Sequence, residues 1–96
     1  MALVFEWDSR KATTNQRKHK VSFDEASTVF SDPLAVIFSD EDHSNGEERE
    51  IIVGHSILDR LLLVSFAEPI KDRIRIISAR NVTRKEQRQY EEENGS

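Results

Sequence analysis

Four strand-like segments follow one another in the second part of the chain, and this succession limits the possible folds more than any other sequence feature. The segments are rich in apolar and β-branched residues at 34–38, 49–57, 61–68 and 73–80, and only a short turn at 58–60 separates the middle two. A run of consecutive strands is typical of an antiparallel meander, whereas a parallel doubly wound sheet alternates strands with helices. The segments therefore predict an antiparallel meander.

The start of the chain predicts a strand followed by a helix. In residues 3–7, Leu3, Phe5 and Trp7 alternate with Val4 and Glu6, as expected for a half-buried strand. Asp8 is a good N-cap for a helix that runs to about residue 19. That helix carries only a narrow stripe suited to face the protein, made of Ala12, Asn15 and His19.

Two capping boxes predict where the other helices begin. In a capping box, a hydroxyl residue precedes a glutamate by three positions, and each side chain satisfies a free backbone N–H group of the other. Ser22 and Glu25 open a helix that stops before Pro33, because proline disfavours helical geometry in the residue before it. Thr83 and Glu86 open a last helix that runs through Tyr90 or a little further.

The resulting order is β-α-α-β-β-β-β-α, an α+β fold in one domain over residues 1–96. Residues 69–72 should break the chain before the last strand, and residues 91–96 should form a frayed tail. The chain has no cysteine, which excludes a disulfide scaffold and cysteine-ligated zinc. It lacks a signal-peptide pattern and any apolar run near the length of a membrane span, so we expect a cytoplasmic protein without a membrane partner.

The charge is distributed unevenly along the chain. The net charge is −4, yet twelve of the fourteen lysines and arginines lie in residues 10–20 and 71–89, while acidic residues gather in 40–50 and 91–93. A polyanion responds to the local potential of a patch, because screening limits interactions beyond about 8–10 Å. The clusters are consistent with a phosphate-binding surface or with solvated basic faces balanced by acidic ones.

Familiar cofactor and metal motifs are absent from the sequence. There is no GxGxxG motif and no P-loop, and His19, His43 and His55 lack metal-ligand spacing. Asp40, Asp42 and Glu47 suggest a cation loop but lack EF-hand spacing, so a solvated hairpin with a turn at Asn45–Gly46 is the better interpretation. We therefore expect no metal and no cofactor.

The remaining candidates are cations and proton carriers, which is the set that metal-free RNA cleavage requires. A base takes the proton of a 2′-hydroxyl that attacks the adjacent phosphate, an acid protonates the departing 5′-oxygen, and cations stabilise the phosphorane. Histidine suits either proton role, and the planar fork of arginine suits a phosphate. The candidates for catalysis are Lys18, His19, Arg80 and Tyr90, and those for substrate binding are Arg17, Arg75, Arg84 and Arg88.

The last strand, "RIRIISAR", limits how many arginines can reach one phosphate. Regular alternation places Ile74, Ile76, Ser78 and Arg80 on one face, and Arg73, Arg75, Ile77 and Ala79 on the other. Unless a bulge interrupts the strand, only one of Arg75 and Arg80 can lie at the centre of a phosphate-binding site, and Arg80 is the leading candidate.

Each candidate also has a purely structural interpretation. Lys18 and His19 stand at a predicted helix C-terminus, where cations complement the helix dipole by about 0.3–1 kcal/mol. The other structural alternatives are a cross-strand pair of Arg75 with Glu50 or Glu68, a sheet-end cap by Arg80, and simple packing of Tyr90 at the end of its helix.

Several segments together resemble the BrnT family, the toxin half of BrnT–BrnA type II toxin–antitoxin systems. No single segment is decisive, but they occur in order and cover nearly the whole chain. They are FEWD at 5–8, NQRKHKVSFDEA at 15–26, VFSDPLA at 29–35, DHSNGEER at 42–49, IRIISAR at 74–80 and the spacing of Glu86 and Tyr90.

The resemblance implies a RelE-like compact fold and a ribosome-independent endoribonuclease that arrests growth. It also implies neutralisation by a BrnA-like ribbon-helix-helix antitoxin, whose complex with the toxin represses their operon. Lys18, His19 and Arg80 match the functional positions, and Tyr90 matches less closely. The chain departs from the family at Lys20 and at the 59–60 turn, where glycine is usual, and in the strand end at 65–68, which lacks the usual polar or basic residue.

Three hypotheses follow from the sequence. The first is a metal-independent endoribonuclease toxin, and the second is a non-catalytic module that binds RNA or an antitoxin. The third is a domain whose basic patch docks an acidic protein. We also predict that the antitoxin covers the basic patch, because no other patch is so strongly charged.

Overall fold

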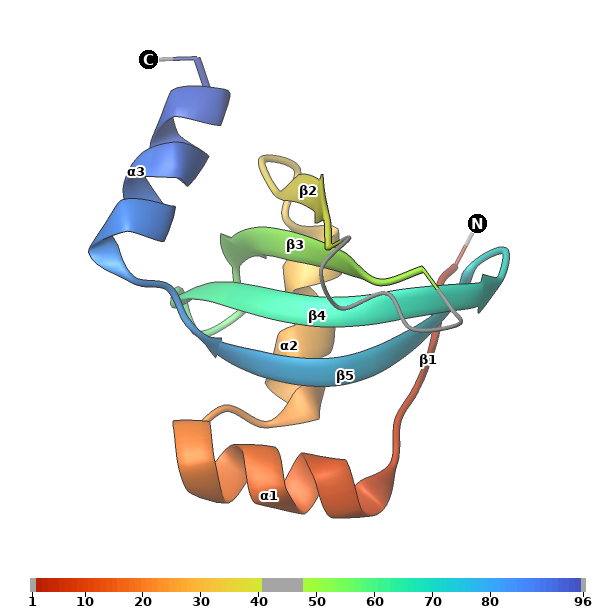
Figure 1. Cartoon of the computed structure of the whole chain (residues 1–96). Helices are drawn as coiled ribbons and strands as arrows, with labels where there is room; N and C mark the ends of the chain where they lie inside the picture. The colour runs from red at the N-terminus through yellow and green to blue at the C-terminus, as the bar shows by residue number, and fades with distance from the viewer. Residues whose placement is uncertain (1, 41–47, 96) are drawn as a thin grey trace.

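A computed structural model describes residues 2–40 and 48–95 of the chain. The sheet has five strands in the order β1-β5-β4-β3-β2, and helices pack around it (Figure 1). The elements are β1 (Val4–Glu6), α1 (Ser9–His19), α2 (Phe23–Thr28), the short 3-10 helix η1 (Val29–Ser31), β2 (Val36–Ser39), β3 (Glu50–His55), β4 (Leu61–Ile70), β5 (Arg73–Asn81) and α3 (Arg84–Glu93).

The antiparallel meander predicted from the sequence is confirmed for β2 to β5, whose neighbours all pair antiparallel. The sheet is mixed, however, because β1 adds to the far side of β5 in parallel, with Val4 opposite Arg73 and Glu6 opposite Arg75. The chain then enters α1, which runs beneath β5 in Figure 1. None of the helices in the described ranges is long and apolar enough to cross a membrane.

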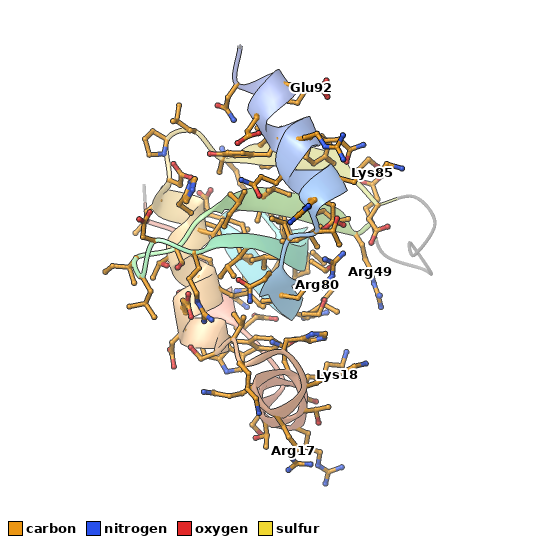
Figure 2. All side chains as sticks on the ribbon, turned by 90° about the vertical axis from the view of Figure 1, so that its left-hand side faces the viewer. Arg17, Lys18, Arg49, Arg80, Lys85 and Glu92 are labelled. Atoms are coloured by element: carbon orange, nitrogen blue, oxygen red, sulfur yellow. The ribbon has the colours of Figure 1, made fainter. Side chains whose placement is uncertain are left out.

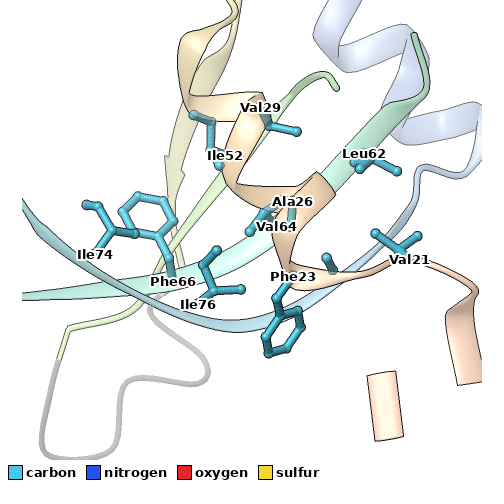
Figure 3. Close-up of a cluster of buried hydrophobic side chains, with 11 residues drawn as sticks. Val21, Phe23, Ala26, Val29, Ile52, Leu62, Val64, Phe66, Ile74 and Ile76 are labelled. Carbon is cyan, nitrogen blue, oxygen red and sulfur yellow. The ribbon is translucent and has the colours of Figure 1, made fainter. Parts of the chain in front are cut away.

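Each face of the sheet has its own apolar cluster. The larger cluster lies between the sheet and α2, where Phe23 and Ala26 meet the inward residues of the central strands (Figure 3). The smaller one lies on the opposite face, where Tyr90 of α3 packs with Val53 and Leu63. The larger cluster consists of Val21, Phe23, Ala26, Val29, Ile52, Leu62, Val64, Phe66, Ile74, Ile76 and Ala79.

The predicted helix starts are confirmed by their hydrogen bonds. The Asp8 carboxylate accepts from the backbone N–H groups of Arg10 and Lys11, which begins α1. Thr83 and Glu86 form a complete capping box at the start of α3. The side chain of Ser22 accepts from the Glu25 N–H as expected, but the carboxylate of Glu25 turns to other partners, described below.

Several predicted boundaries differ from the structure. The helix predicted to stop before Pro33 is an α-helix only to Thr28 and continues as the 3-10 helix η1 to Ser31, and the strand predicted over 49–57 ends at His55. The break predicted at residues 69–72 begins later, because β4 continues through Pro69 to Ile70. Proline lacks a backbone N–H, and it is tolerated here because the β4–β5 register is already irregular between Ala67 and Ile70. The last helix extends to Glu93, so residues 91–93 are helical and not frayed. Most of the predicted polar hairpin, including Asp42, Asn45, Gly46 and Glu47, lies outside the described residues.

Candidate functional site

A bulge in β5 changes which arginines share a face of the sheet. Ser65 of β4 pairs with Ser78, but the next residue, Phe66, pairs with Ile76, so Ile77 is an extra residue. Because of this insertion, Ala79 joins Ile74 and Ile76 in the larger core cluster.

The predicted separation of Arg75 and Arg80 on opposite faces is therefore wrong. Arg80 pairs with Leu63, which belongs to the cluster beneath α3, and Arg75 alternates with the core residues Ile74 and Ile76. Both arginines therefore lie on the sheet face opposite α2.

Buried Asn15 attaches α1 to this bulge. Its side-chain amide donates to the carbonyl oxygens of Val21 and Ala79, each over 2.9 Å, and its carbonyl accepts from the Ala79 N–H over 3.0 Å. The side chain therefore ties the helix, the following loop and the strand together. From the sequence, Asn15 was placed only on the protein-facing stripe of its helix, although an amide within an apolar stripe is itself a signal of buried hydrogen bonding.

A groove of ≈ 390 Å³ lies between α1 and the bulge. Its helix side carries the cations predicted from the sequence, with Lys18 exposed and His19 half-buried, and its strand side carries Ile77 and Ser78. The other lining residues are Arg10, Lys11, Thr14 and Asn15.

The end of α1 is held in place by an ion pair whose carboxylate is buried. Arg60 donates to the carboxylate of Glu25 through Nε, over 2.9 Å, and through Nη2, and it also donates to the Lys20 carbonyl oxygen over 3.1 Å. Ser56 donates to the same carboxylate over 2.7 Å. The Arg60 contact lowers the pKa of Glu25 against the opposing effect of burial, so Glu25 is an anion in the folded protein.

The two turns at which the resemblance predicts glycine have a glycine-like backbone. Lys20 ends α1 with φ 60° and ψ 31°, and Asp59 has φ 62° in the β3–β4 turn. Both angles are left-handed, a region that glycine enters without a steric penalty. Lys20 and Asp59 therefore turn the chain with the backbone geometry that glycine would adopt.

Arg80 is paired with a glutamate from the start of α3. Its Nη1 and Nη2 atoms donate to the two carboxylate oxygens of Glu86, each over 2.8 Å. The Arg80 contact is the largest effect on the pKa of Glu86 and lowers it. Burial raises this pKa and the Thr83 N–H lowers it further, and the result is a pKa of about 2. Glu86 is thus an anion at neutral pH and has no proton to give.

The other arginines have separate environments. Arg75 donates from Nε to Glu6 of the parallel neighbour β1 over 3.0 Å, and Arg73 approaches the same carboxylate at 3.8 Å. The predicted alternative partners of Arg75, Glu50 and Glu68, are therefore replaced by a residue 69 positions away in the sequence. Three further candidates, Arg17, Arg84 and Arg88, are exposed on their helices.

Tyr90 lies apart from the α1 groove. Its ring meets the His55 ring edge-on at 5.8 Å between centroids, and it packs on the sheet beneath α3. Burial, with a smaller contribution from Asp32, raises the pKa of Tyr90. The structure thus brings Lys18 and His19 together and does not add Tyr90 to them.

A line of cations runs along one side of the molecule. Figure 2 places Lys18 at the end of α1, Arg80 and Arg49 beside the sheet, and Lys85 on α3 along the same side. We call these four residues the basic face. Arg49 is half-buried and was not among the sequence candidates, because a lone arginine before a strand carries no pattern. Among the described residues, no group of three or more histidine or acidic side chains could hold a metal ion.

Fold and site together define a class of protein: a compact α+β domain whose mostly antiparallel sheet presents clustered cations along one side. Residues 7–86 match the family described as "Ribonuclease toxin, BrnT, of type II toxin-antitoxin system". The chain belongs to this family, which confirms the resemblance predicted from the sequence. The family's activity is that of a ribonuclease toxin, and its partner class is an antitoxin.

A solved structure has the same fold. The chain is similar to the ribonuclease toxin BrnT of Brucella abortus, with a TM-score of 0.62 and 22% sequence identity over 88% of this chain and 99% of that one. The predicted α+β class is confirmed by this likeness. No curated protein sequence matches the chain.

Proposed function

We propose that this protein is a metal-independent endoribonuclease that cleaves RNA by attack of a 2′-hydroxyl on the adjacent phosphate. The observation that carries the proposal is the β5 bulge, which sets Arg80 on the same side of the molecule as the groove that holds Lys18 and His19. A phosphate in this region would meet a proton carrier and cations from two separate elements.

The residues have distinct roles in this proposal. His19 transfers a proton to or from the reacting oxygens, since an imidazole can both accept and donate a proton. Lys18 and Arg80 stabilise the charge that develops on the phosphorane, and Arg75 lies further along the same sheet face to contact the RNA backbone. Arg17, Arg84 and Arg88 add exposed positive charge for the RNA on either side. Tyr90 supports α3, because its ring is buried against the sheet.

RNA cleavage in EDTA tests the proposal. Wild type should cleave RNA under single-turnover conditions without added metal, and His19→Ala or Arg80→Ala should lower the rate on the order of 10²-fold or more. The matched controls are His55→Ala and Arg73→Ala, which remove the same side-chain types at positions to which the proposal gives no role, and thermal unfolding verifies folding of every variant. If wild type and the site variants leave RNA equally intact, the protein is a non-catalytic RNA-binding or antitoxin-binding module.

The proposed partner is a ribbon-helix-helix antitoxin that covers the basic face in the cytoplasm and links the complex to operator DNA. Covering Lys18, His19 and Arg80 would silence cleavage directly, because these residues contact the substrate in the proposal. A complex in which these three side chains stay open to solvent would contradict this. A small ribbon-helix-helix reading frame beside the gene would identify the partner to use.

A further inference from the structure

Arg80 is paired with Glu86, yet one complete hydrogen-bonding edge of its guanidinium group has no partner among the residues that the structure describes. A guanidinium group has five N–H donors in a fixed planar arrangement. Three of them are used: one on each Nη atom for Glu86, and the second on Nη1 for the Asn81 carbonyl oxygen at 3.2 Å. Two remain, the Nε–H and the second Nη2–H, and they lie side by side on the same edge of the plane.

Nothing in residues 2–40 and 48–95 accepts a hydrogen bond from that edge. The Arg80 side chain is 37% exposed, and its Nε atom is not among the fully buried polar atoms that lack a partner in the described part of the chain. Two parallel N–H donors match the spacing of two oxygens on one phosphate. The pair with Glu86 therefore leaves a fork for an anion and does not fill it.

The orientation of Arg80 is fixed through the start of α3. The Oε1 atom of Glu86 accepts from Arg80 and also from the Thr83 N–H at 2.9 Å, and Thr83 in turn caps the helix. The carboxylate is thus held by the helix backbone before it holds the arginine. Because its charge cancels that of Arg80, attraction of a phosphate at this point depends on oriented donors more than on net charge.

We propose that Glu86 is a positioning residue for RNA binding: it holds Arg80 so that the Nε and Nη2 edge receives the two non-bridging oxygens of a phosphodiester. The inference rests on the proposed function for the identity of the ligand. It assigns to the capping-box glutamate a second role, in the geometry of the site. It also explains why lysine would not replace Arg80, since an ammonium group has no fork.

The test uses Glu86→Gln, because glutamine at this position of a capping box still supports the helix start. The control is Glu92→Gln, which removes the same charge from an exposed position of α3. The probe is RNA with 2′-O-methyl groups, which binds without being cleaved because the attacking hydroxyl is blocked. The readout is the NMR signal of the Arg80 Nε–H group, followed by single-turnover cleavage of ordinary RNA.

In wild type and Glu92→Gln, the Arg80 Nε–H signal should be sharp and should shift saturably with the 2′-O-methyl RNA. In Glu86→Gln, most of this shift should be lost, and cleavage at saturating RNA should fall about tenfold or more. Arg80→Lys should cleave as poorly as Arg80→Ala. The proposal is overturned if the wild-type signal does not respond, if Glu86→Gln responds equally, or if Glu86→Gln binds RNA more tightly and cleaves faster, since Glu86 would then compete with phosphate.

These outcomes are separable from those of the proposed function. A wild-type protein whose Arg80 signal responds to RNA, but which leaves ordinary RNA intact in EDTA, has the phosphate fork without the catalytic activity. A protein that cleaves RNA while the Arg80 signal stays unchanged has the activity without this fork.

Discussion

Replacing Asn15 with alanine should destabilise the protein strongly, because the side chain is the main polar link between α1 and the β5 bulge. It is 6% exposed and makes three hydrogen bonds to backbone groups of Val21 and Ala79. A buried hydrogen bond contributes about 0.5–1.5 kcal/mol net, and a partner left unsatisfied costs about 1–3 kcal/mol. The loss should therefore be about 2–4 kcal/mol, a large share of the 5–15 kcal/mol typical of a domain.

Asn15→Asp should cost more than Asn15→Ala at neutral pH. The carboxylate has nearly the shape of the amide and still accepts from the Ala79 N–H. It cannot donate to the carbonyl oxygens of Val21 and Ala79, and it brings an unpaired charge into a buried site. The expected order of stability is wild type, then Asn15→Ala, then Asn15→Asp.

Urea unfolding followed by circular dichroism measures these differences. The matched control is Gln16→Ala on the same helix, an exposed position that should stay within about 0.5 kcal/mol of wild type. For a chain of this size, 1 kcal/mol shifts the Tm by about 4–8 °C, so a thermal scan should show Asn15→Ala melting on the order of 10–25 °C lower. A cost below about 1 kcal/mol for Asn15→Ala, or an Asn15→Asp variant as stable as wild type, would refute the role given to this side chain.

Three further predictions concern stability. Gly54→Ala should lower the free energy of unfolding by about 1–3 kcal/mol in urea, because the new Cβ would lie 2.9 Å from both the Ala35 Cβ and the Asp32 Oδ2; a neutral result would contradict the close packing. Lys20→Gly should raise the free energy of unfolding by up to about 1 kcal/mol, and with it the Tm, because glycine adopts the left-handed backbone at this position without a steric penalty. A lower Tm would contradict this. The ion pair of Glu86 adds stability that is fully present above pH 4.5 and is lost as the pH falls toward the folded-state pKa of Glu86, which is about 2. Between pH 5 and pH 2.5, wild type should therefore lose about 1–2 kcal/mol more free energy of unfolding than Glu86→Gln. Parallel pH profiles of the two proteins would refute this.

Local sequence patterns predicted most of the fold because they act over a few residues. Asp8 and the Thr83–Glu86 box begin helices through contacts within one turn, and these starts are where the structure has them. The meander also followed from short connections between neighbouring strands. The parallel pairing of β1 with β5 did not follow, because it joins residues about seventy positions apart and leaves no local trace.

The site was harder to predict than the fold for the same reason. Alternation assumes a regular strand, and one extra residue at Ile77 moved Arg80 to the face of Arg75. The bulge is stabilised by Asn15, whose partner Ala79 lies 64 positions away. Residue types made the cations candidates for phosphate binding, but the directions of their side chains depended on a contact that no short pattern contains.

The glutamates of the two predicted capping boxes differ in burial and in what their arginine partners do. Each stands three residues after the hydroxyl residue that caps its helix, and each carboxylate binds an arginine from elsewhere in the chain: Glu25 binds Arg60, and Glu86 binds Arg80. Glu25 is 7% exposed, and Arg60 uses a further donor on the Lys20 carbonyl oxygen, so this pair joins α2, the β3–β4 turn and the end of α1. The pair at Arg80 is more open, and it leaves one edge of the guanidinium to solvent. Glu25 thus holds the end of the helix that carries His19, and Glu86 directs the fork of Arg80 outward.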